Sequence, residues 1–554
     1  MKSLGSNSDI EKLVLKNAIM HDGKADVGSV VNKFVGVFPE MKPRIREVMG
    51  EIKASVERIN SLSIDEQMNL ATGKYPEILV DEKKSNEHPL AQLKNVKGRV
   101  VMRMAPSPSG PLHLGHTRMC ILNDEYVKRY GGELILRIED TNPNNIYPPA
   151  YDMIPEDNKW LGVNFTSLVI QSERIPLYYE RAQELIMMGK AYMCTCDVEE
   201  FKRDLMNSTA CPHREMKPEE HLEMFRNVIN GKEKSKSPVL IIKTDLFHPN
   251  PAVRDWIAFR VIDKEHPHTG KRFRFYPLMN FSVAIDDHEL GLTHVIRGSD
   301  HINNTERQKY IFRYFGWEIP EYFHYGTIHI GDTILKTSLM RKGIESGQYI
   351  GWDDVQLATV RALARRGYKP ETFRKYWIDS GLKDVNSDFS WDIFNSINRQ
   401  FIDKSSNRYF FVPNPVKIRV EDAPETISNI PLYPNDDSRG YRKYSVERNP
   451  VISVPGSDLK DLGEGEIIRL KDLYNIKKEG ESFKFAGKEN TGSRKRIIQW
   501  VPGDGIEFSI LKPDGTTDTG VVEPLLLNKR GIFQMERYAF INVVGDHTGL
   551  FLHR

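Results

Sequence analysis

The sequence predicts a multidomain protein: an α/β unit built on a parallel sheet, helical segments on both sides of it in the chain, and an all-β C-terminal region. Residues 99–140 alternate an apolar run, a Pro-rich turn, a helical stretch that Gly131 and Gly132 stop, and a second apolar run, which is the pattern of a strand–helix–strand unit. From residue 409 onward, short alternating runs are separated by Pro, Asp and Gly turns, as in a β-sandwich or barrel. A length of 554 residues leaves room for several domains.

The balance of charge and the scarcity of cysteine limit the class of protein. The chain carries 78 Lys and Arg against 76 Asp and Glu, so any nucleic-acid surface must be a local basic face. No long apolar run and no apolar signal segment occurs, which argues against a membrane protein. Four cysteines, three of them within residues 194–211, do not form the pattern of a secreted disulfide framework. We therefore predict a soluble, cytoplasmic protein.

The first part of the chain is predicted to be a helical appendage followed by a linker. Ile10, Leu13 and Val14 lie at helical spacing, and short amphipathic stretches continue to about residue 62. Residues 83–89 are polar and predict a linker. Because no catalytic constellation occurs here, we interpret this segment as a docking or structural appendage. Its candidate partner is another protein.

The turn after the first predicted strand is a candidate anion site. Ser109 and Gly110 supply turn chemistry, and Gly115 has no side chain, so a flat base or a phosphate could approach the backbone. The helix that begins there would direct its free N–H groups and positive end at an anion. His113 and His116 lie on one face of this helix and can donate hydrogen bonds to charge that develops on a phosphate. A Pro-rich loop with two surface histidines is the alternative interpretation.

These motifs resemble those of a known enzyme family. Residues 106–116 (PSPSGPLHLGH) are similar to the nucleotide-binding signature of class I aminoacyl-tRNA synthetases. Residues 103–110 (RMAPSPSG) and 137–143 (RIEDTNP) resemble its glutamyl/glutaminyl branch. The β-rich C-terminal region resembles the barrels of archaeal and eukaryotic glutamyl-tRNA synthetases and of glutaminyl enzymes, whereas bacterial glutamyl enzymes have helices there. The resemblance extends from about residue 98 onward.

The resemblance implies a division of the chain into six segments. In order, they are an N-terminal helical appendage and linker (1–97), the first half of a Rossmann-like catalytic domain (98–193), an inserted α+β domain that binds the tRNA acceptor end (194–272), the second half of the catalytic domain (273–330), a mobile loop with a helical tRNA-stem domain (331–408), and anticodon-binding β-barrels (409–554).

The resemblance also implies which residues bind the small substrates. Those expected to cradle ATP are Pro108, Ser109, Gly110, His113, Gly115, His116 and Lys336. In the family, Arg103 and Ser107 face the amino acid and an acid at Glu139 holds its α-ammonium group. These assignments agree with the charges of a zwitterion, whose ammonium group needs an anion and whose carboxylates need cations or N–H donors.

Arg297 is the residue that favours glutamate as the amino acid. It follows a short predicted strand, at the carboxyl end where a ligand would lie. Glutamyl enzymes of the family resemble this sequence in having Arg here, whereas glutaminyl enzymes have a small neutral residue. A guanidinium binds a γ-carboxylate in fork geometry and matches an amide poorly.

Two positions depart from the family pattern. Met279 stands where the family usually carries a Tyr against the substrate, so we predict a polar contact from Asn280 instead. Thr337 stands where the critical lysine of the mobile loop is expected. Among the nearby cations Lys336, Arg341 and Lys342, we predict that Lys336 closes over the triphosphate, because this role is electrostatic. The alternative is that Lys336 is a displaced surface residue.

Two further sets of residues are candidate sites outside the nucleotide fold. The first is a pair of knuckles with soft ligands about fifteen residues apart, which suits a tetrahedral structural zinc site: Cys194, Cys196, Cys211 and His213. Buried free thiols are the alternative; in parts of the glutamyl family a similar knuckle braces the inserted domain. The second set offers cations and a stacking face for anticodon bases: Arg494, Lys495, Arg496 and Trp500.

The function that the resemblance implies is ATP-dependent activation of glutamate and its transfer to tRNA for glutamate, with Mg²⁺ inferred from the chemistry. Charging of tRNA for glutamine is left open. The rivals are a glutaminyl-tRNA synthetase, a nucleotidyltransferase that acts on a small molecule, and a non-catalytic tRNA-binding scaffold descended from a synthetase. Arg297 argues against the first, the inserted and β regions against the second, and Thr337 favours the third.

Overall fold

The computed structural model divides into two compact units, Met1–His88 and Pro89–Arg554. It describes residues 7–20, 23–75, 78, 90–233, 238–331, 333–489 and 496–554. The predicted linker at 83–89 lies outside these ranges. Among the described helices, none has the length and apolarity that a membrane crossing requires.

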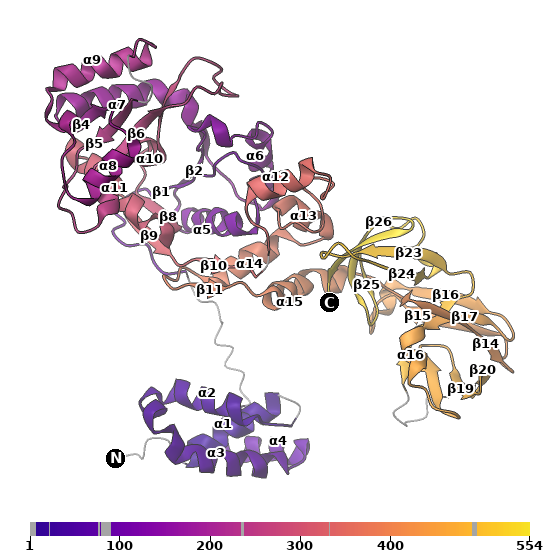
Figure 1. The fold of residues 1–554 in the computed structure, drawn as a ribbon. Helices are drawn as coiled ribbons and strands as arrows, with labels where there is room; N and C mark the ends of the chain where they lie inside the picture. Colours follow the sequence, from indigo (N-terminus) through magenta and orange to yellow (C-terminus); the bar gives the residue numbers. More distant parts are fainter. Residues whose placement is uncertain are drawn as a thin grey trace. The chain divides into compact units, whose positions relative to one another are not determined.

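The N-terminal unit is helical, as the spacing of its apolar residues predicted. It contains α1 (Asn7–Met20), α2 (Val27–Val37), α3 (Ile45–Asn60) and α4 (Ile64–Lys74) (Figure 1). The apolar faces of these helices meet in one core that includes Val14, Phe34 and Ile52, none of which is measurably exposed. Because each helix is short, this shared core rather than helix propensity stabilises them.

The first half of the second unit's sheet is a parallel β1–β2–β3 arrangement that follows the predicted strand–helix–strand pattern. Its elements are β1 (Val101–Met104), α5 (Leu114–Tyr130), β2 (Glu133–Ile138), α6 (Ala150–Trp160) and β3 (Ser167–Ile170). Helix α5 stops at Gly131, whose φ of 62° is the left-handed conformation that glycine adopts without strain. The Gly-Gly stop signal of the sequence is therefore confirmed.

The second half of the sheet domain adds α10 (Met279–Glu289), β8 (His294–Gly298), α11 (Ile302–Phe315) and β9 (Glu321–Tyr325). Strands β8 and β9 are parallel, and β8 lies beside β1, because Thr293 donates its backbone N–H to the Val101 carbonyl at 3.0 Å. The β8–β9 pair therefore extends alongside the β1–β2–β3 sheet, next to β1. The carboxyl ends of β1, β2 and β8 meet at one edge, where ligands bind in open parallel sheets.

The inserted region is an antiparallel sheet flanked by helices, in agreement with the α+β domain expected there. The strands run in the order β4 (Ala191–Cys194), β5 (Val239–Ile242), β6 (Trp256–Val261) and β7 (Phe275–Pro277), with α7 (Ile175–Met187), α8 (Val198–Met206) and α9 (Pro218–Ile229) around them. Phe225 and Phe259 of this region share one core with Phe281 of α10 and Phe312 of α11. The insertion is therefore packed onto the sheet domain rather than hinged from it.

A helical region follows the sheet domain. It comprises α12 (Thr337–Glu345), α13 (Val360–Arg366), α14 (Pro370–Ser380) and α15 (Trp391–Ile402), with a small parallel pair formed by β10 (Ile328–His329) and β11 (Ser387–Asp388). Buried Arg366 donates a 2.8 Å hydrogen bond from Nη2 to the Leu552 carbonyl, and Asn398 Nδ2 lies 3.0 Å from His553 Nε2. These contacts attach the β region to the helices.

The C-terminal region is all-β and contains two seven-stranded sheets and a β15–β16 hairpin (Figure 1). The strands of the first sheet, in chain order, are β12 (Arg408–Tyr409), β13 (Phe411–Pro413), β23 (Ile506–Leu511), β24 (Thr517–Val522), β25 (Gly531–Met535), β26 (Ala539–Gly545) and β27 (Thr548–His553). Those of the second sheet are β14 (Pro415–Glu421), β17 (Val451–Pro455), β18 (Ile467–Leu470), β19 (Asn475–Glu479), β20 (Ser482–Phe485), β21 (Ile497–Ile498) and β22 (Val501–Pro502). The hairpin is β15 (Thr426–Pro431) and β16 (Tyr441–Val446).

Candidate active site and metal centre

The Pro-rich turn after β1 is held against the end of β2 by backbone hydrogen bonds. The Pro106 carbonyl accepts from the Glu139 N–H at 3.0 Å, and the Pro108 carbonyl accepts from the Tyr147 N–H at 2.8 Å. These bonds bring two sequence motifs together, so that Ser107 and Glu139 both line one cavity. The two residues that the family resemblance assigns to the amino acid therefore lie on the wall of the same cavity.

His113 and His116 stack on each other at the start of α5. Their ring centroids are 3.6 Å apart, and the His113 backbone N–H donates to His116 Nδ1 at 3.4 Å. Burial lowers the pKa of His116 to about 4; burial and the neighbouring His116 lower that of His113 well below its usual value. Both rings are therefore neutral at pH 7 and each offers one N–H donor. A Cβ on Gly115 would lie 3.1 Å from His113 Cε1, so glycine leaves room for this ring.

The loop before α12 packs on the same turn. The Thr337 hydroxyl lies 2.8 Å from that of Ser109, and a Cβ on Gly110 would lie 3.4 Å from Thr337 Cβ. Lys336, immediately before Thr337, has an exposed side chain. Thr337, which replaces the expected lysine, thus contacts the turn of residues 106–116, and the adjacent Lys336 is exposed.

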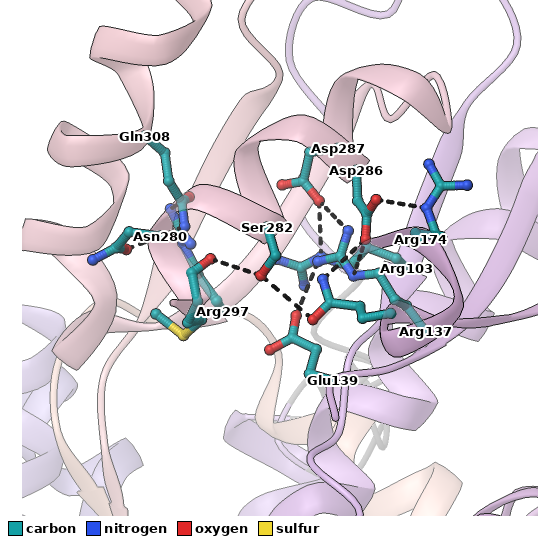
Figure 2. Close-up of polar contacts among 12 residues, drawn as sticks. Arg103, Arg137, Glu139, Arg174, Asn280, Ser282, Asp286, Asp287, Arg297 and Gln308 are labelled. Carbon is teal, nitrogen blue, oxygen red and sulfur yellow. Dashed lines mark hydrogen bonds and ion pairs between the residues drawn. The ribbon is translucent and has the colours of Figure 1, made fainter. Parts of the chain in front are cut away.

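A buried network of charges lies between β2 and α10 (Figure 2). Arg137, which is fully buried, donates from Nη1 to Asp287 at 2.7 Å and from Nη2 to Glu139 at 3.0 Å. Arg103 Nε lies 3.4 Å from the same Asp287 oxygen. These carboxylates, with burial opposing them, raise the pKa of Arg137, while Arg103 and Arg137 lower that of Asp287 against the effect of burial. Arg137 and Asp287 therefore both remain ionised.

Asp286 anchors the same network from its other side. Its carboxylate accepts from Gln171 Nε2 at 2.9 Å, from Arg174 Nε at 2.8 Å and from the Tyr178 hydroxyl at 2.7 Å. Sequence reasoning missed Arg137, Asp286 and Asp287. The available signal was a charged residue inside an apolar strand and an acidic pair inside an apolar helix, because such residues are buried only when they are paired.

Arg297, at the carboxyl end of β8, has a different environment. It is 6% exposed, and its Nη2 donates to the Thr305 hydroxyl and, at 3.0 Å, to Gln308 Oε1. Its guanidinium stacks over the Tyr322 ring, 4.7 Å from the centroid. Burial and the nearby Arg103 lower its pKa to about 10, so it is still charged at pH 7.

No carboxylate in the described part of the chain forms an ion pair with Arg297. The three carboxylates of the network (Glu139, Asp286 and Asp287) pair with Arg103, Arg137 and Arg174, and Arg297 is a fourth buried guanidinium beside them. A buried cation without a counter-ion is costly by several kcal/mol. The excess of positive charge at Arg297 therefore favours an anionic ligand.

Asn280 lies at the edge of this site but is engaged by neighbours. Its Nδ2 donates to Asn304 Oδ1 at 3.2 Å, and its Oδ1 accepts from Gln308 Nε2 at 3.4 Å. Asn280 and Met279 both line the adjoining cavity. Figure 2 shows Asn280 and Gln308 on the Arg297 side of the network.

A cavity of about 1050 Å³ extends from this edge of the sheet into the inserted region. On the sheet side it is lined by Ser107, Glu139, Met279 and Asn280; on the insertion side its lining includes Cys194, Cys196, Trp256, Arg254 and Arg260. Arg307 of α11 also lines it. The cavity is thus open to a ligand much larger than an amino acid, with several cations in its wall.

The two predicted knuckles come together in space. Cys194 and Cys211 Sγ are 3.7 Å apart, which excludes a disulfide, and His213 Nδ1 lies 3.4–3.8 Å from the three sulfurs. In a tetrahedral site with metal–sulfur bonds of about 2.3 Å, two sulfurs lie about 3.8 Å apart. The other His213 nitrogen, Nε2, is 3.0 Å from the Thr195 hydroxyl, which orients the ring. The four residues could hold a tetrahedral metal ion.

The structure corrects one member of the predicted anticodon set, Trp500. Trp500 is 1% exposed, and its Nε1 donates to the Lys471 carbonyl at 2.9 Å, so its ring is part of the barrel core and cannot stack on a base. Arg496 forms an ion pair with Asp458 at 3.4 Å. Arg494 and Lys495 lie outside the described residues. Trp500 lies between two short strands, β21 (Ile497–Ile498) and β22 (Val501–Pro502).

Two family models match consecutive parts of the chain. Residues 99–404 match the family described as tRNA synthetases class I (E and Q), catalytic domain, and residues 406–493 match its anti-codon binding domain. A glutamate–tRNA ligase of Thermoplasma volcanium is 51% identical over 98% of this chain and 99% of its own length. That of Pyrococcus furiosus is 44% identical over 97% of each. A solved glutamate tRNA ligase from Elizabethkingia meningosepticum has a TM-score of 0.41 and 21% identity, covering 56% of this chain and 71% of that chain.

Replacing Asp287 with Asn tests the buried network. We expect Asp287→Asn to lower the free energy of unfolding by about 3–5 kcal/mol, because it leaves Arg103 and Arg137 without their shared carboxylate. The matched control is Glu289→Gln on the same helix, whose ion pair with Arg181 lies at the surface and should contribute less than about 1 kcal/mol. Urea and thermal unfolding measure both variants. Equal effects would contradict the role of Asp287.

Proposed function

The chain belongs to the class I tRNA synthetases of the glutamate and glutamine (E and Q) family, and we propose from this premise that it attaches glutamate to tRNA. In the first step the α-carboxylate of glutamate attacks the α-phosphorus of ATP in line, and pyrophosphate leaves. In the second step a hydroxyl of the terminal tRNA ribose attacks the activated carbonyl, and AMP leaves. No covalent enzyme intermediate is needed, so positioning and electrostatic stabilisation carry the catalysis.

The observation that carries this proposal is the buried Arg297 without a carboxylate partner among the described residues. Glutamate brings a γ-carboxylate that would neutralise it, while glutamine would place an uncharged amide there. Glu139 is placed to receive the α-ammonium, since it lines the cavity beside Ser107 and is only partly buried. We assign Arg103 to the same substrate, because its guanidinium shares Asp287 with Arg137 rather than having a carboxylate of its own.

ATP is proposed to bind at the turn of residues 106–116. Two neutral imidazoles, His113 and His116, lie at the N-terminus of α5, where backbone N–H groups and the helix dipole favour phosphate. We assign to the same ATP site the other residues of this turn that the resemblance implied: Pro108, Ser109, Gly110 and Gly115. Mg²⁺, when bound to ATP, would neutralise charge that develops on the leaving pyrophosphate.

tRNA is proposed to enter through the large cavity and to reach the β region. Arg254, Arg260 and Arg307 in the cavity wall suit the phosphates of a single-stranded 3′ end. The match of residues 406–493 to an anticodon-binding domain supports binding of the other end of the tRNA by the β region. We propose tRNA for glutamate as the partner, the cytoplasm as the location, and the N-terminal helices as a protein-docking appendage.

Pyrophosphate exchange tests the proposed reaction. We expect exchange with glutamate, dependent on tRNA, and little exchange with glutamine. Arg297→Cys should lower kcat/KM for glutamate by about 100-fold or more, because a charge-assisted fork is lost from a buried site. Arg313→Cys, an exposed arginine at the end of α11, is the matched control and should leave exchange unchanged.

Three outcomes of this assay would change the conclusion. Exchange with glutamine rather than glutamate would identify a glutaminyl enzyme. No exchange under any condition would support the scaffold alternative, which Thr337 in place of the loop lysine favours. Unchanged glutamate kinetics in Arg297→Cys would remove Arg297 from the specificity argument. Aminoacylation of purified tRNA for glutamine, run beside tRNA for glutamate, determines whether both are charged.

Lys336 is proposed to close over the phosphates, since it adjoins Thr337, which touches the nucleotide turn. Lys336→Ala should lower kcat of exchange by about tenfold or more while leaving KM for glutamate within about threefold, because its charge acts on the phosphates of the transition state. Lys342→Ala, an exposed lysine within helix α12, which Lys336 immediately precedes, is the control. If kcat falls in Lys342→Ala but not in Lys336→Ala, Lys342 rather than Lys336 acts on the phosphates.

Zinc is proposed for the Cys3His site, where it would brace the wall of the tRNA cavity through Cys194 and Cys196. Elemental analysis should find about one zinc per chain, the stoichiometry of one closed tetrahedral site. Cys211→Ser should lose the metal and raise KM for tRNA more than KM for glutamate. Cys120→Ser is the control that keeps the metal, because Cys120 lies in the sheet-domain core. Full zinc content in Cys211→Ser would refute the site.

A further inference from the structure

One nitrogen of the Arg297 guanidinium, Nη2, already donates both of its hydrogens to side chains of the protein. Nη2 donates to the Thr305 hydroxyl and to Gln308 Oε1, and an Nη group carries two hydrogens, so both are used. No residue in the described part of the chain accepts from Nη1, and Nε is buried without a partner there. The donors left for a substrate therefore lie on the Nε and Nη1 edge.

Gln308 and Tyr322 restrict the guanidinium in two further directions. The Gln308 side chain is fully buried, and its Nε2 donates to Asn280 Oδ1 at 3.4 Å, which fixes the amide so that Oε1 faces Arg297. The Tyr322 ring lies against the guanidinium at 4.7 Å from its centroid and limits tilting out of the plane. The third contact that orients the Arg297 guanidinium is the hydrogen bond from Nη2 to the Thr305 hydroxyl.

The Thr305 hydroxyl accepts from Arg297 and has one proton to donate. Its nearest acceptor is Nε2 of His324, at 2.7 Å, and the His301 carbonyl is farther away at 3.2 Å. Residue His324 lies on β9, directly opposite Arg297 on β8 in the parallel register. Burial, together with the nearby Arg297 and Lys309, lowers the pKa of His324 to about 4, so at pH 7 its ring is neutral and Nε2 can accept.

We propose that Thr305, with its proton held by His324, is a positioning residue that fixes which edge Arg297 presents to the γ-carboxylate of the amino acid. The inference rests on the proposed function and deepens it. A fixed edge offers only N–H donors, which satisfy both oxygens of a carboxylate but leave the amide NH₂ of glutamine facing other donors. A guanidinium that could turn would meet the amide with a single bond, and the preference for glutamate would fall.

The test compares paired variants of the full chain in tRNA-dependent pyrophosphate exchange. Thr305→Val removes the hydroxyl at equal size, and Thr305→Ser keeps it. His324→Phe keeps a ring without an acceptor, and His324→Gln keeps an acceptor. We expect Thr305→Val to raise KM for glutamate about 10- to 100-fold and His324→Phe about tenfold, the range of a buried hydrogen bond to a charged group. Thr305→Ser and His324→Gln should remain within about threefold of the wild type.

A positioning role predicts a specific kinetic pattern. KM for ATP and kcat should change by less than about threefold, while the preference for glutamate over glutamine falls in parallel with the rise in KM for glutamate. Thermal melting checks that each variant is folded. A general loss of kcat for all substrates, or equal effects of His324→Phe and His324→Gln, would overturn the inference in favour of a structural role.

The wild type separates this inference from the proposed function. If the wild type exchanges pyrophosphate with glutamate and Thr305→Val keeps the wild-type KM, the inference fails and the function stands. If the wild type shows no exchange, calorimetric binding of glutamate to the same variants replaces KM as the readout. Absence of glutamate binding by the wild type would overturn both.

Discussion

Burial of guanidinium groups on one face of the parallel sheet is the constraint on which the rest of this site depends. Water is excluded there, so each positive charge needs a carboxylate or must face a charged ligand. Arg137 meets this requirement by pairing with Asp287, which lies 150 residues farther along the chain. The pair connects β2 with α10, and in doing so it brings the two halves of the sheet domain, separated in sequence by the insertion, into one site.

The arginines of this site differ in whether their partners are charged or neutral. Arg137 is committed to Asp287 and Glu139, and Arg103 shares Asp287 with it. Arg297 is bonded instead by the neutral side chains of Thr305 and Gln308. Neutral partners can orient a cation without neutralising it, so the charge of Arg297 remains available to a substrate. An anionic ligand is then favoured because no carboxylate among the described residues of the protein pairs with Arg297.

Helix α10 also connects the buried charge network to the inserted region. One side of the helix carries Asp286 and Asp287, and another side places Phe281 against Phe259 of the insertion, with ring centroids 4.8 Å apart. Close-packed aromatic cores transmit displacement because they have little free volume. The insertion, the Cys3His knuckle and the charge network are therefore held in a fixed relation around the large cavity, as two reacting substrates require.

The sequence by itself determined the features that depend on a few neighbouring residues: the helix stop at Gly131, the alternation of the β region, the knuckle at Cys194 and Cys196, and the place of Arg297 at a strand end. Only the tertiary structure decided that Trp500 belongs to a core, that Arg137 pairs with Asp287, and that Thr337 touches the nucleotide turn. The physical reason is that turn and strand conformations are set by local backbone preferences. Which face of a strand is buried, and which distant charge neutralises a buried one, depends on packing between segments that the local pattern does not specify.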